Sequence, residues 1–132
     1  MVIEGLKYTK DHEWVRLLEG DVAEIGITDF AQDQLGDIVF VEVPEVGRVL
    51  AKGEALGVVE SVKTVSDIFS PVSGEVIETN SKLHEDGDEF TPELINESPY
   101  EEGWILRVKM SDPQEYKELL DAESYKAITE EA

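Results

Sequence analysis

Lys63 occupies the position in this chain that is best suited to covalent modification by another enzyme. It lies within the polar segment Glu60–Asp67, between the apolar pairs Val58–Val59 and Ile68–Phe69, which we expect to belong to strands. A lysine at the tip of a hairpin-like turn is accessible from nearly all sides. Most surface lysines are only solvated charges, but this spacing favours a residue whose amine is covalently modified.

A weak internal repeat around Lys63 supports that interpretation. We expect one strand to open at Gly36–Val39, before the lysine, and another at Gly74–Ile77, after it. Each is followed by a glycine beside an acidic residue and then by apolar side chains, two at Lys52–Leu56 and one at Asp86–Phe90. Such a repeat is typical of two similar β-units that face each other, and it places Lys63 near their junction.

The rest of the chain offers little catalytic chemistry of its own. It has no cysteine, no nucleophile elbow, no phosphate-binding glycine loop and no zinc-binding helix motif. The two histidines are His12 and His84, and the neighbours in Asp11-His12-Glu13 are expected to point to opposite faces of a strand. We therefore expect a protein that is not an enzyme, that holds no metal, and whose chemistry belongs to an attached cofactor.

The charge of the chain restricts its partners. Among 132 residues, 31 are acidic and 11 are basic, which gives a net charge of −20. This charge repels nucleic acid and anionic membranes, and it favours partners with basic docking surfaces. No stretch approaches the roughly 18 apolar residues of a membrane span.

We expect a monomer in the cytoplasm of a bacterium or archaeon, or in the mitochondrial matrix for a mature organellar form.

Residues from about 14 to 110 carry the signals of a β core. Trp14–Leu18 and Val22–Ile27 flank a short polar loop and predict a hairpin. Ile38–Val43 is a nearly continuous apolar run that we expect to be a buried strand, and Trp104–Met110 is the last expected strand. Glycine and proline interrupt the chain at short intervals between these segments, which favours a sandwich or a barrel.

Two helical segments are expected beside this core. Thr28 is suited to cap a short helix over residues 29–35 that ends at Gly36. Asp112 and Pro113 form a strong helix start, and we expect the C-terminal helical segment to span about residues 112–128.

Five segments in a fixed order carry a more specific signal: Tyr8–Val15, Gly26–Gln32, Leu35–Val41, Glu60–Lys63 and Leu94–Tyr100. Together they resemble the glycine cleavage system H proteins, over nearly the whole chain. The resemblance implies a mainly β fold, the lipoyl-type barrel-sandwich hybrid of two antiparallel sheets, with a short internal helix and a C-terminal helix. It implies one lipoyl-carrier domain over residues 1–132.

The resemblance also implies a cofactor and the residue that bears it. Lys63 matches the lysine that carries covalent lipoate as N6-lipoyl-lysine. Its neighbours Glu60, Ser61, Val62 and Thr64 are the lipoylation-site surroundings that a lipoate ligase or lipoyltransferase would meet. Amide formation removes the charge of the lysine and adds a long arm, which brings one intermediate to several active sites at high effective concentration.

The implied partners are the three enzymes of the glycine cleavage cycle. Glycine decarboxylase (the P protein) releases carbon dioxide and loads an aminomethyl group onto the arm. A tetrahydrofolate-dependent aminomethyltransferase (the T protein) takes the one-carbon unit, and dihydrolipoamide dehydrogenase (the L protein) reoxidises the arm. By the same resemblance, Glu13 and Asp67 face the aminomethyl nitrogen in a cleft. Asp11 is the third residue expected in this cleft, at a position where the family often has serine. Gln34 stands where some relatives have histidine.

Other functions are compatible with parts of this pattern. A biotin acceptor usually has methionine on both sides of its lysine, where this chain has Val62 and Thr64. A lipoyl domain of a 2-oxo acid dehydrogenase usually has Asp-Lys-Ala and belongs to a multidomain chain. A relay that passes lipoate to other proteins shares the H-like features, and the sequence does not separate that role from glycine cleavage. A protein that only mediates interactions is the remaining alternative.

Overall fold

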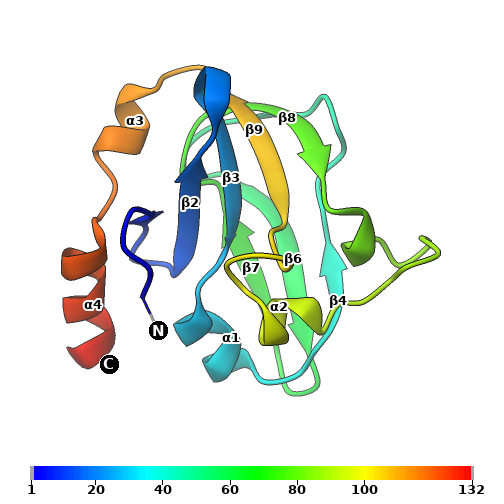
Figure 1. Ribbon diagram of the computed structural model, residues 1–132. Helices are drawn as coiled ribbons and strands as arrows, with labels where there is room; N and C mark the ends of the chain where they lie inside the picture. Colours follow the sequence, from blue (N-terminus) through cyan, green and yellow to red (C-terminus); the bar gives the residue numbers. More distant parts are fainter. Residues whose placement is uncertain (1, 132) are drawn as a thin grey trace.

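Two antiparallel sheets form the body of the computed structural model, which describes residues 2–131 (Figure 1). The larger sheet consists, in spatial order, of β1 (Lys7–Tyr8), β2 (Glu13–Leu17), β3 (Val22–Ile27), β9 (Leu106–Met110), β8 (Gly74–Thr79) and β5 (Val49–Leu50). The smaller sheet consists of β4 (Ile38–Glu42), β6 (Ala55–Ser61) and β7 (Val65–Phe69). The predicted arrangement of two antiparallel sheets is confirmed.

Each sheet buries one apolar face against the other. Side chains alternate between the two faces of a strand, and the inward-facing set forms one buried cluster that includes Val15, Ile25, Val59, Ile68, Val76 and Val108. A second cluster joins the N-terminal segment to the C-terminal helix through Tyr8, Trp14, Tyr100 and Tyr125. The rings of Tyr8 and Tyr125 stack with their centroids 4.5 Å apart.

The first helix begins and ends where the sequence predicts. In α1 (Asp29–Leu35) the Thr28 hydroxyl accepts a hydrogen bond from the Ala31 backbone N–H, and Gly36 ends the helix at a φ of 83°. The remaining short elements before β9 are the 3-10 turns η1 (Glu19–Asp21) and η2 (Ser81–Leu83) and the helix α2 (Leu94–Glu97). Within residues 2–131, no helix is both long and apolar enough to cross a membrane.

The run at Ile38–Val43 forms a strand, but the expectation that all of it is buried is wrong. Ile38 and Val41 are buried, whereas Val39 is 45% exposed. The reason is that the smaller sheet buries only one face against the larger sheet, and the register shift against β6 between Ile38 and Phe40 leaves Val39 on the outer side. One face of β4 covers the core, and the other face is open to solvent.

The C-terminal segment is two helices rather than one. α3 covers only Gln114–Lys117, and α4 covers Ala122–Glu131. Between them Leu120 exchanges two backbone hydrogen bonds with Tyr8, at 2.8 and 2.9 Å. Asp121 then starts a new helix, because its carboxylate accepts a hydrogen bond from the Ser124 N–H. Backbone pairing with the N-terminal strand therefore overrides the helical periodicity at this point.

The internal repeat is only partly present. Gly74–Thr79 forms β8, as expected, but Asp86–Phe90 lies in a loop and forms no strand. His12 also differs from the expectation, because it lies in a turn with a φ of 71° rather than in a strand. Its Nδ1 atom lies 2.8 Å from the Tyr125 hydroxyl, so that turn is tied to α4.

The hydroxyl of Tyr125 should contribute measurably to stability. It lies 2.8 Å from His12 Nδ1 and 2.7 Å from the Thr28 hydroxyl. Tyr125→Phe keeps the stacked ring but removes both bonds, so we expect the free energy of unfolding in urea to fall by about 1–2 kcal/mol. The matched control is Tyr116→Phe, because the Tyr116 hydroxyl has no hydrogen bond to any residue in the described range. An equal loss in both variants would contradict this role.

Candidate functional site

Lys63 lies at the tip of the β6–β7 hairpin, in the connection of three residues between Ser61 and Val65. The turn is closed by Ser61. Its backbone N–H donates to the Thr64 carbonyl at 2.8 Å. Its buried hydroxyl accepts hydrogen bonds from the backbone N–H groups of Lys63 and Thr64, at 3.3 and 3.1 Å. A serine hydroxyl that satisfies turn amides stabilises the turn locally, and here it leaves the lysine side chain outside.

The turn is also held from outside, by the connection between α1 and β4. The backbone N–H of Val62 donates to the Asp37 carbonyl at 3.0 Å. The stem of Lys63 lies over Gly36, where an added Cβ would be 3.3 Å from Lys63 Cε. Because Gly36 also has a φ of 83°, both its backbone conformation and the passage of the lysine favour glycine.

The amine of Lys63 is available for reaction. The residue is exposed, and its amine forms no ion pair with any residue of the range 2–131. Its neighbours Val62 and Val65 are 70% and 61% exposed. A modifying enzyme can therefore reach the turn without unfolding it. These residues fit a covalently attached acyl group, because the lysine is accessible and its backbone is fixed.

One face of β7 leads from this turn toward a pocket. Ile68 is buried in the core, so the alternate residues Val65, Asp67 and Phe69 lie on the opposite, outer face of the strand. Two residues of a strand advance about 7 Å. Asp67 and Phe69 are thus successive steps away from the lysine, and Phe69 lines the pocket itself.

The pocket has a volume of about 360 Å³ and lies where the β1–β2 turn, the end of β7 and the C-terminal segment meet. Its acidic residues include Glu13 and Asp11, while Asp67 is not part of its lining. Apolar surface comes from Phe69, Leu119 and Leu120. The sequence-predicted acids are therefore brought to one side of the molecule, with Asp67 on the strand face between the turn and the pocket.

Glu13 is the most unusual ionisable group of this pocket. It is only 3% exposed. One carboxylate oxygen accepts from the Thr9 hydroxyl at 2.6 Å, and the other accepts from the Phe69 backbone N–H at 3.2 Å. Burial raises the pKa of Glu13 to about 7, against the opposing effect of these two hydrogen bonds and with a further increase from Asp11. The side chain thus changes its charge near neutral pH.

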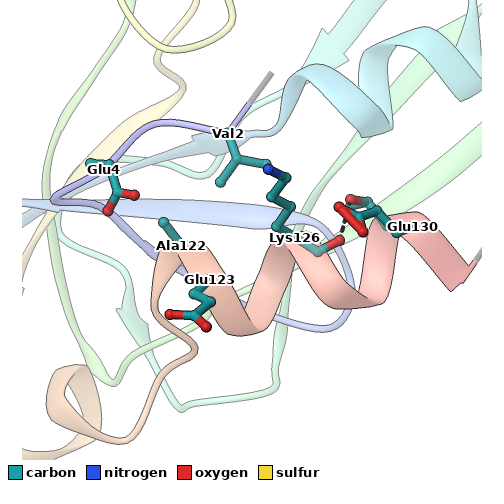
Figure 2. Close-up of a pocket in the computed structure, with 7 residues that line it drawn as sticks. Val2, Glu4, Ala122, Glu123, Lys126 and Glu130 are labelled. Atoms are coloured by element: carbon teal, nitrogen blue, oxygen red, sulfur yellow. Dashed lines mark hydrogen bonds between the residues drawn. The ribbon is translucent and has the colours of Figure 1, made fainter.

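A second concave surface does not share these features. It lies between the N-terminal segment and α4 and is lined by Val2, Glu4, Ala122, Glu123, Lys126 and other residues (Figure 2). Its charged side chains are exposed, and it contains no residue of the Lys63 turn. The pocket beside Glu13 is therefore the better candidate for a site that works together with Lys63.

The model of the family described as glycine cleavage H-protein matches residues 6–132. The chain belongs to this family. A glycine cleavage system H protein of Symbiobacterium thermophilum is 60% identical over 126 residues, which cover 96% of this chain and 94% of that protein. One from Thermus thermophilus is 59% identical over 123 residues, covering 93% and 91%.

A solved structure agrees with the fold. The crystal structure of a glycine cleavage system H protein from Mycobacterium marinum superposes with a TM-score of 0.82 at 39% identity, over 96% of this chain and 97% of that one. The mainly β barrel-sandwich hybrid is confirmed, as two facing sheets rather than a closed barrel. Members of the H-protein family are not catalysts but carriers of covalent lipoate, and their system includes the P, T and L proteins.

Several residues of this site were missed by the sequence reasoning. Thr9 and Phe69 hold the carboxylate of Glu13, and Gly36 and Asp37 support the lysine turn. Gln34, where some relatives carry histidine, is exposed. The segments that contain Thr9 and Gly36 are among those that carry the family resemblance, which is the signal that could have indicated them. Their contacts join residues distant in sequence, so no local pattern reveals them.

Ionisation of Glu13 should reduce stability as pH rises. The folded protein keeps a proton on Glu13 up to about pH 7, whereas the reference pKa is 4.5. The contribution of Glu13 to stability is thus complete below the reference pKa of 4.5 and is lost as pH rises through the folded pKa of about 7. Relative to Glu13→Gln, the free energy of unfolding of the native chain should fall by about 2–3 kcal/mol between about pH 5 and about pH 8.

Urea unfolding of both proteins at several pH values measures this difference. Glu75→Gln is the control, since Glu75 is exposed on β8, and it should not alter the pH dependence. A difference between native chain and Glu13→Gln that stays constant with pH would show that Glu13 is ionised throughout.

Proposed function

We propose that Lys63 is the residue that carries lipoate, and that the protein uses this arm to shuttle the aminomethyl cargo of glycine cleavage. The observation that supports the proposal most directly is the lysine turn. Its backbone is fixed by Ser61 and by the Val62–Asp37 hydrogen bond, while the amine is exposed. A carrier needs such a combination, because the anchor must be rigid and the attached arm free to move.

Attachment is an acyl transfer in which the chain supplies the nucleophile. A lipoate ligase converts lipoate and ATP into lipoyl-adenylate and pyrophosphate. The neutral amine of Lys63 attacks the acyl carbon, a C–N bond forms, the C–O bond to the phosphate breaks, and AMP leaves. The proton that the amine loses passes to water. The modified lysine is an amide and is uncharged.

The outer face of β7 and the pocket beyond it are proposed as the surface on which the loaded arm rests. The attached lipoyl group supplies two sulfur atoms that accept the one-carbon amine and electrons. The chain supplies Asp67 on the strand face, followed by Glu13 and Asp11 at the pocket. These carboxylates favour a cationic amine, and an ammonium close to Glu13 would in turn stabilise its ionised form.

The proposed partners follow from the same role. The P, T and L proteins are those of the glycine cleavage system, and a net charge of −20 suits basic docking surfaces on them. A lipoate ligase or lipoyltransferase is the proposed modifying enzyme. We propose that the carrier acts as a monomer, since one exposed turn and one pocket are contained in a single chain. The bacterial relatives support a cytoplasmic rather than a mitochondrial location.

Modification and exchange assays test this function. After reaction with lipoate ligase, peptide mapping should place the lipoyl mass on the peptide that contains Lys63. The lipoylated protein should then allow glycine decarboxylase to exchange carbon dioxide with the carboxyl group of glycine, and Lys63→Ala should abolish the exchange while leaving the circular dichroism spectrum unchanged. Stoichiometric lipoylation of Lys63→Arg, or exchange without lipoate, would refute the assignment.

The role of the acids is tested by the lifetime of the loaded arm. Without the T protein, Glu13→Gln and Asp67→Asn should lose the aminomethyl group roughly tenfold faster than the native chain, which corresponds to the loss of about 1–2 kcal/mol of charge-assisted hydrogen bonding. Lipoylation should be unaffected. The exposed Glu75 provides the control variant Glu75→Gln. Equal rates of aminomethyl loss in the native chain and the three variants would show that Glu13 and Asp67 do not hold the aminomethyl group.

A further inference from the structure

Asn96, in α2, uses its whole side-chain amide on the connection between α1 and β4. Its Nδ2 atom donates to the Gly36 carbonyl at 2.8 Å and to the Gln32 side-chain carbonyl at 2.9 Å. Its Oδ1 atom accepts from the Ile38 backbone N–H at 2.9 Å. A backbone carbonyl can only accept and a backbone N–H can only donate, so these partners determine the orientation of the amide.

The groups bound by Asn96 lie on both sides of the residue that holds the lysine turn. Gly36 and Ile38 flank Asp37, whose carbonyl accepts the Val62 N–H. Gly36 itself lies beneath the stem of Lys63. The side chain of Asn96 therefore holds the short piece of backbone on which the turn rests, although Asn96 has no hydrogen bond to any residue of the turn.

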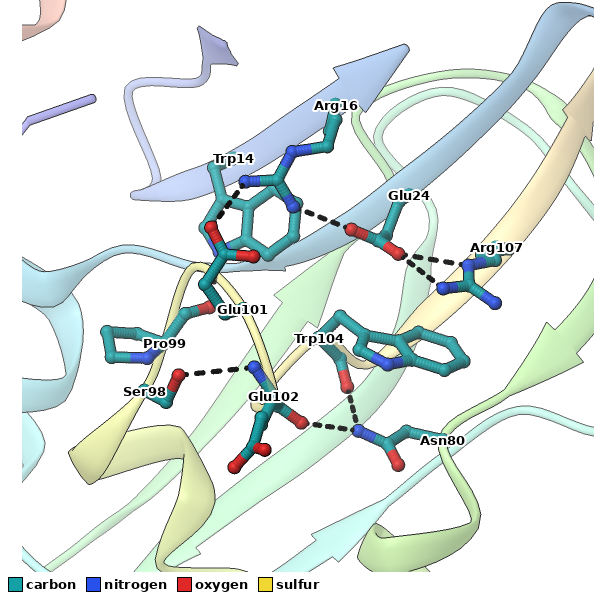
Figure 3. A network of polar contacts seen from close by, with 10 residues as sticks. All are labelled: Trp14, Arg16, Glu24, Asn80, Ser98, Pro99, Glu101, Glu102, Trp104 and Arg107. Atoms are coloured by element: carbon teal, nitrogen blue, oxygen red, sulfur yellow. Dashed lines mark hydrogen bonds and ion pairs between the residues drawn. The ribbon is translucent and has the colours of Figure 1, made fainter. Parts of the chain in front are cut away.

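The segment that contains Asn96 is itself anchored to the larger sheet (Figure 3). Trp14 Nε1 donates to the Pro99 carbonyl at 2.9 Å. A separate contact lies farther along the loop, just after β8: Asn80 Nδ2 donates to the carbonyls of Glu102 and Trp104, at 2.8 and 2.7 Å, and has no hydrogen bond to a residue of α2. Close by, the nearly buried Glu24 pairs with arginines of β2 and β9. The Trp14–Pro99 bond thus ties the chain just beyond α2 to the sheet opposite the one that bears the lysine.

We propose that Asn96 is a positioning residue that keeps the Lys63 turn in the conformation recognised by the lipoylating enzyme. The inference rests on the proposed attachment of lipoate at Lys63. The physical reason is that the enzyme binds only the fraction of molecules whose turn has the recognised geometry. If the α1–β4 connection loses its support, the turn adopts the recognised geometry for a smaller fraction of the time, and the apparent affinity of the enzyme falls by that fraction.

Asn96→Asp is the sharpest variant. It keeps the acceptor for the Ile38 N–H, but it replaces the donating nitrogen by an oxygen that faces the Gly36 carbonyl. Asn80→Asp is a matched control, since Asn80 likewise donates to two carbonyls and accepts from the Lys82 N–H, away from the Lys63 turn. Asn96→Ala is a second variant that removes all three bonds and that a helical position tolerates.

The measurement is the steady-state kinetics of lipoylation by a lipoate ligase with lipoate and ATP, with each carrier variant as the varied substrate. For Asn96→Asp and Asn96→Ala we expect KM for the carrier to rise roughly five- to tenfold, with kcat unchanged. Hydrogen exchange at the Val62 amide should accelerate in the same two variants. Asn80→Asp should lower the melting temperature without changing either KM or the exchange of Val62.

An unchanged KM in both Asn96 variants would overturn the inference, as would an equal rise of KM in Asn80→Asp, which would indicate a general loss of stability. These results differ from a failure of the proposed function. In that case peptide mapping finds lipoate on a residue other than Lys63, or Lys63→Arg is modified as fully as the native chain.

Discussion

The hydrogen bond from the Val62 N–H to the Asp37 carbonyl is the contact on which presentation of Lys63 depends. An accessible lysine must have few side-chain contacts, so its position has to be determined by the backbone of its turn. Ser61 shapes the turn from within, but it cannot orient the hairpin relative to the rest of the protein. Pairing of β6 with β4 orients the hairpin, and the bond to Asp37 extends that pairing to the turn itself, because Asp37 lies between α1, which Thr28 caps, and β4.

Electrostatics set a second constraint on this carrier. A net charge of −20 is tolerated because most acidic side chains are exposed to water and to screening ions. The exceptions are informative. Glu24 is buried between Arg16 and Arg107, which neutralise it. Glu13 is buried without a cation among its hydrogen-bond partners, and its raised pKa is the consequence. A cationic cargo would supply the positive partner that the ionised carboxylate of Glu13 lacks.

Local chemistry explains the predictions that succeeded and tertiary contacts explain those that failed. The β2–β3 hairpin and α1 follow from turn residues and from a cap within a few positions, so they were predictable. The exposure of Val39 depends on which face of β4 packs on the other sheet and on the register shift of β4 against β6. The break at Leu120 depends on pairing with Tyr8, more than a hundred residues away in the chain. Neither partner is visible in a local pattern.

The sequence by itself determined the turn that bears Lys63, a core of short strands and the absence of cysteine chemistry, because these depend on residue types at short spacing. The two-sheet architecture was expected from the family resemblance. The sequence also indicated Glu13 as an acid of interest through family resemblance. Only the tertiary structure decided that Glu13 is buried against Phe69, that Asp67 lies outside the pocket, and that Asn96 supports the lysine turn. Each of these depends on which distant backbone groups meet in space, since burial and long-range hydrogen bonds arise only once the two sheets have packed.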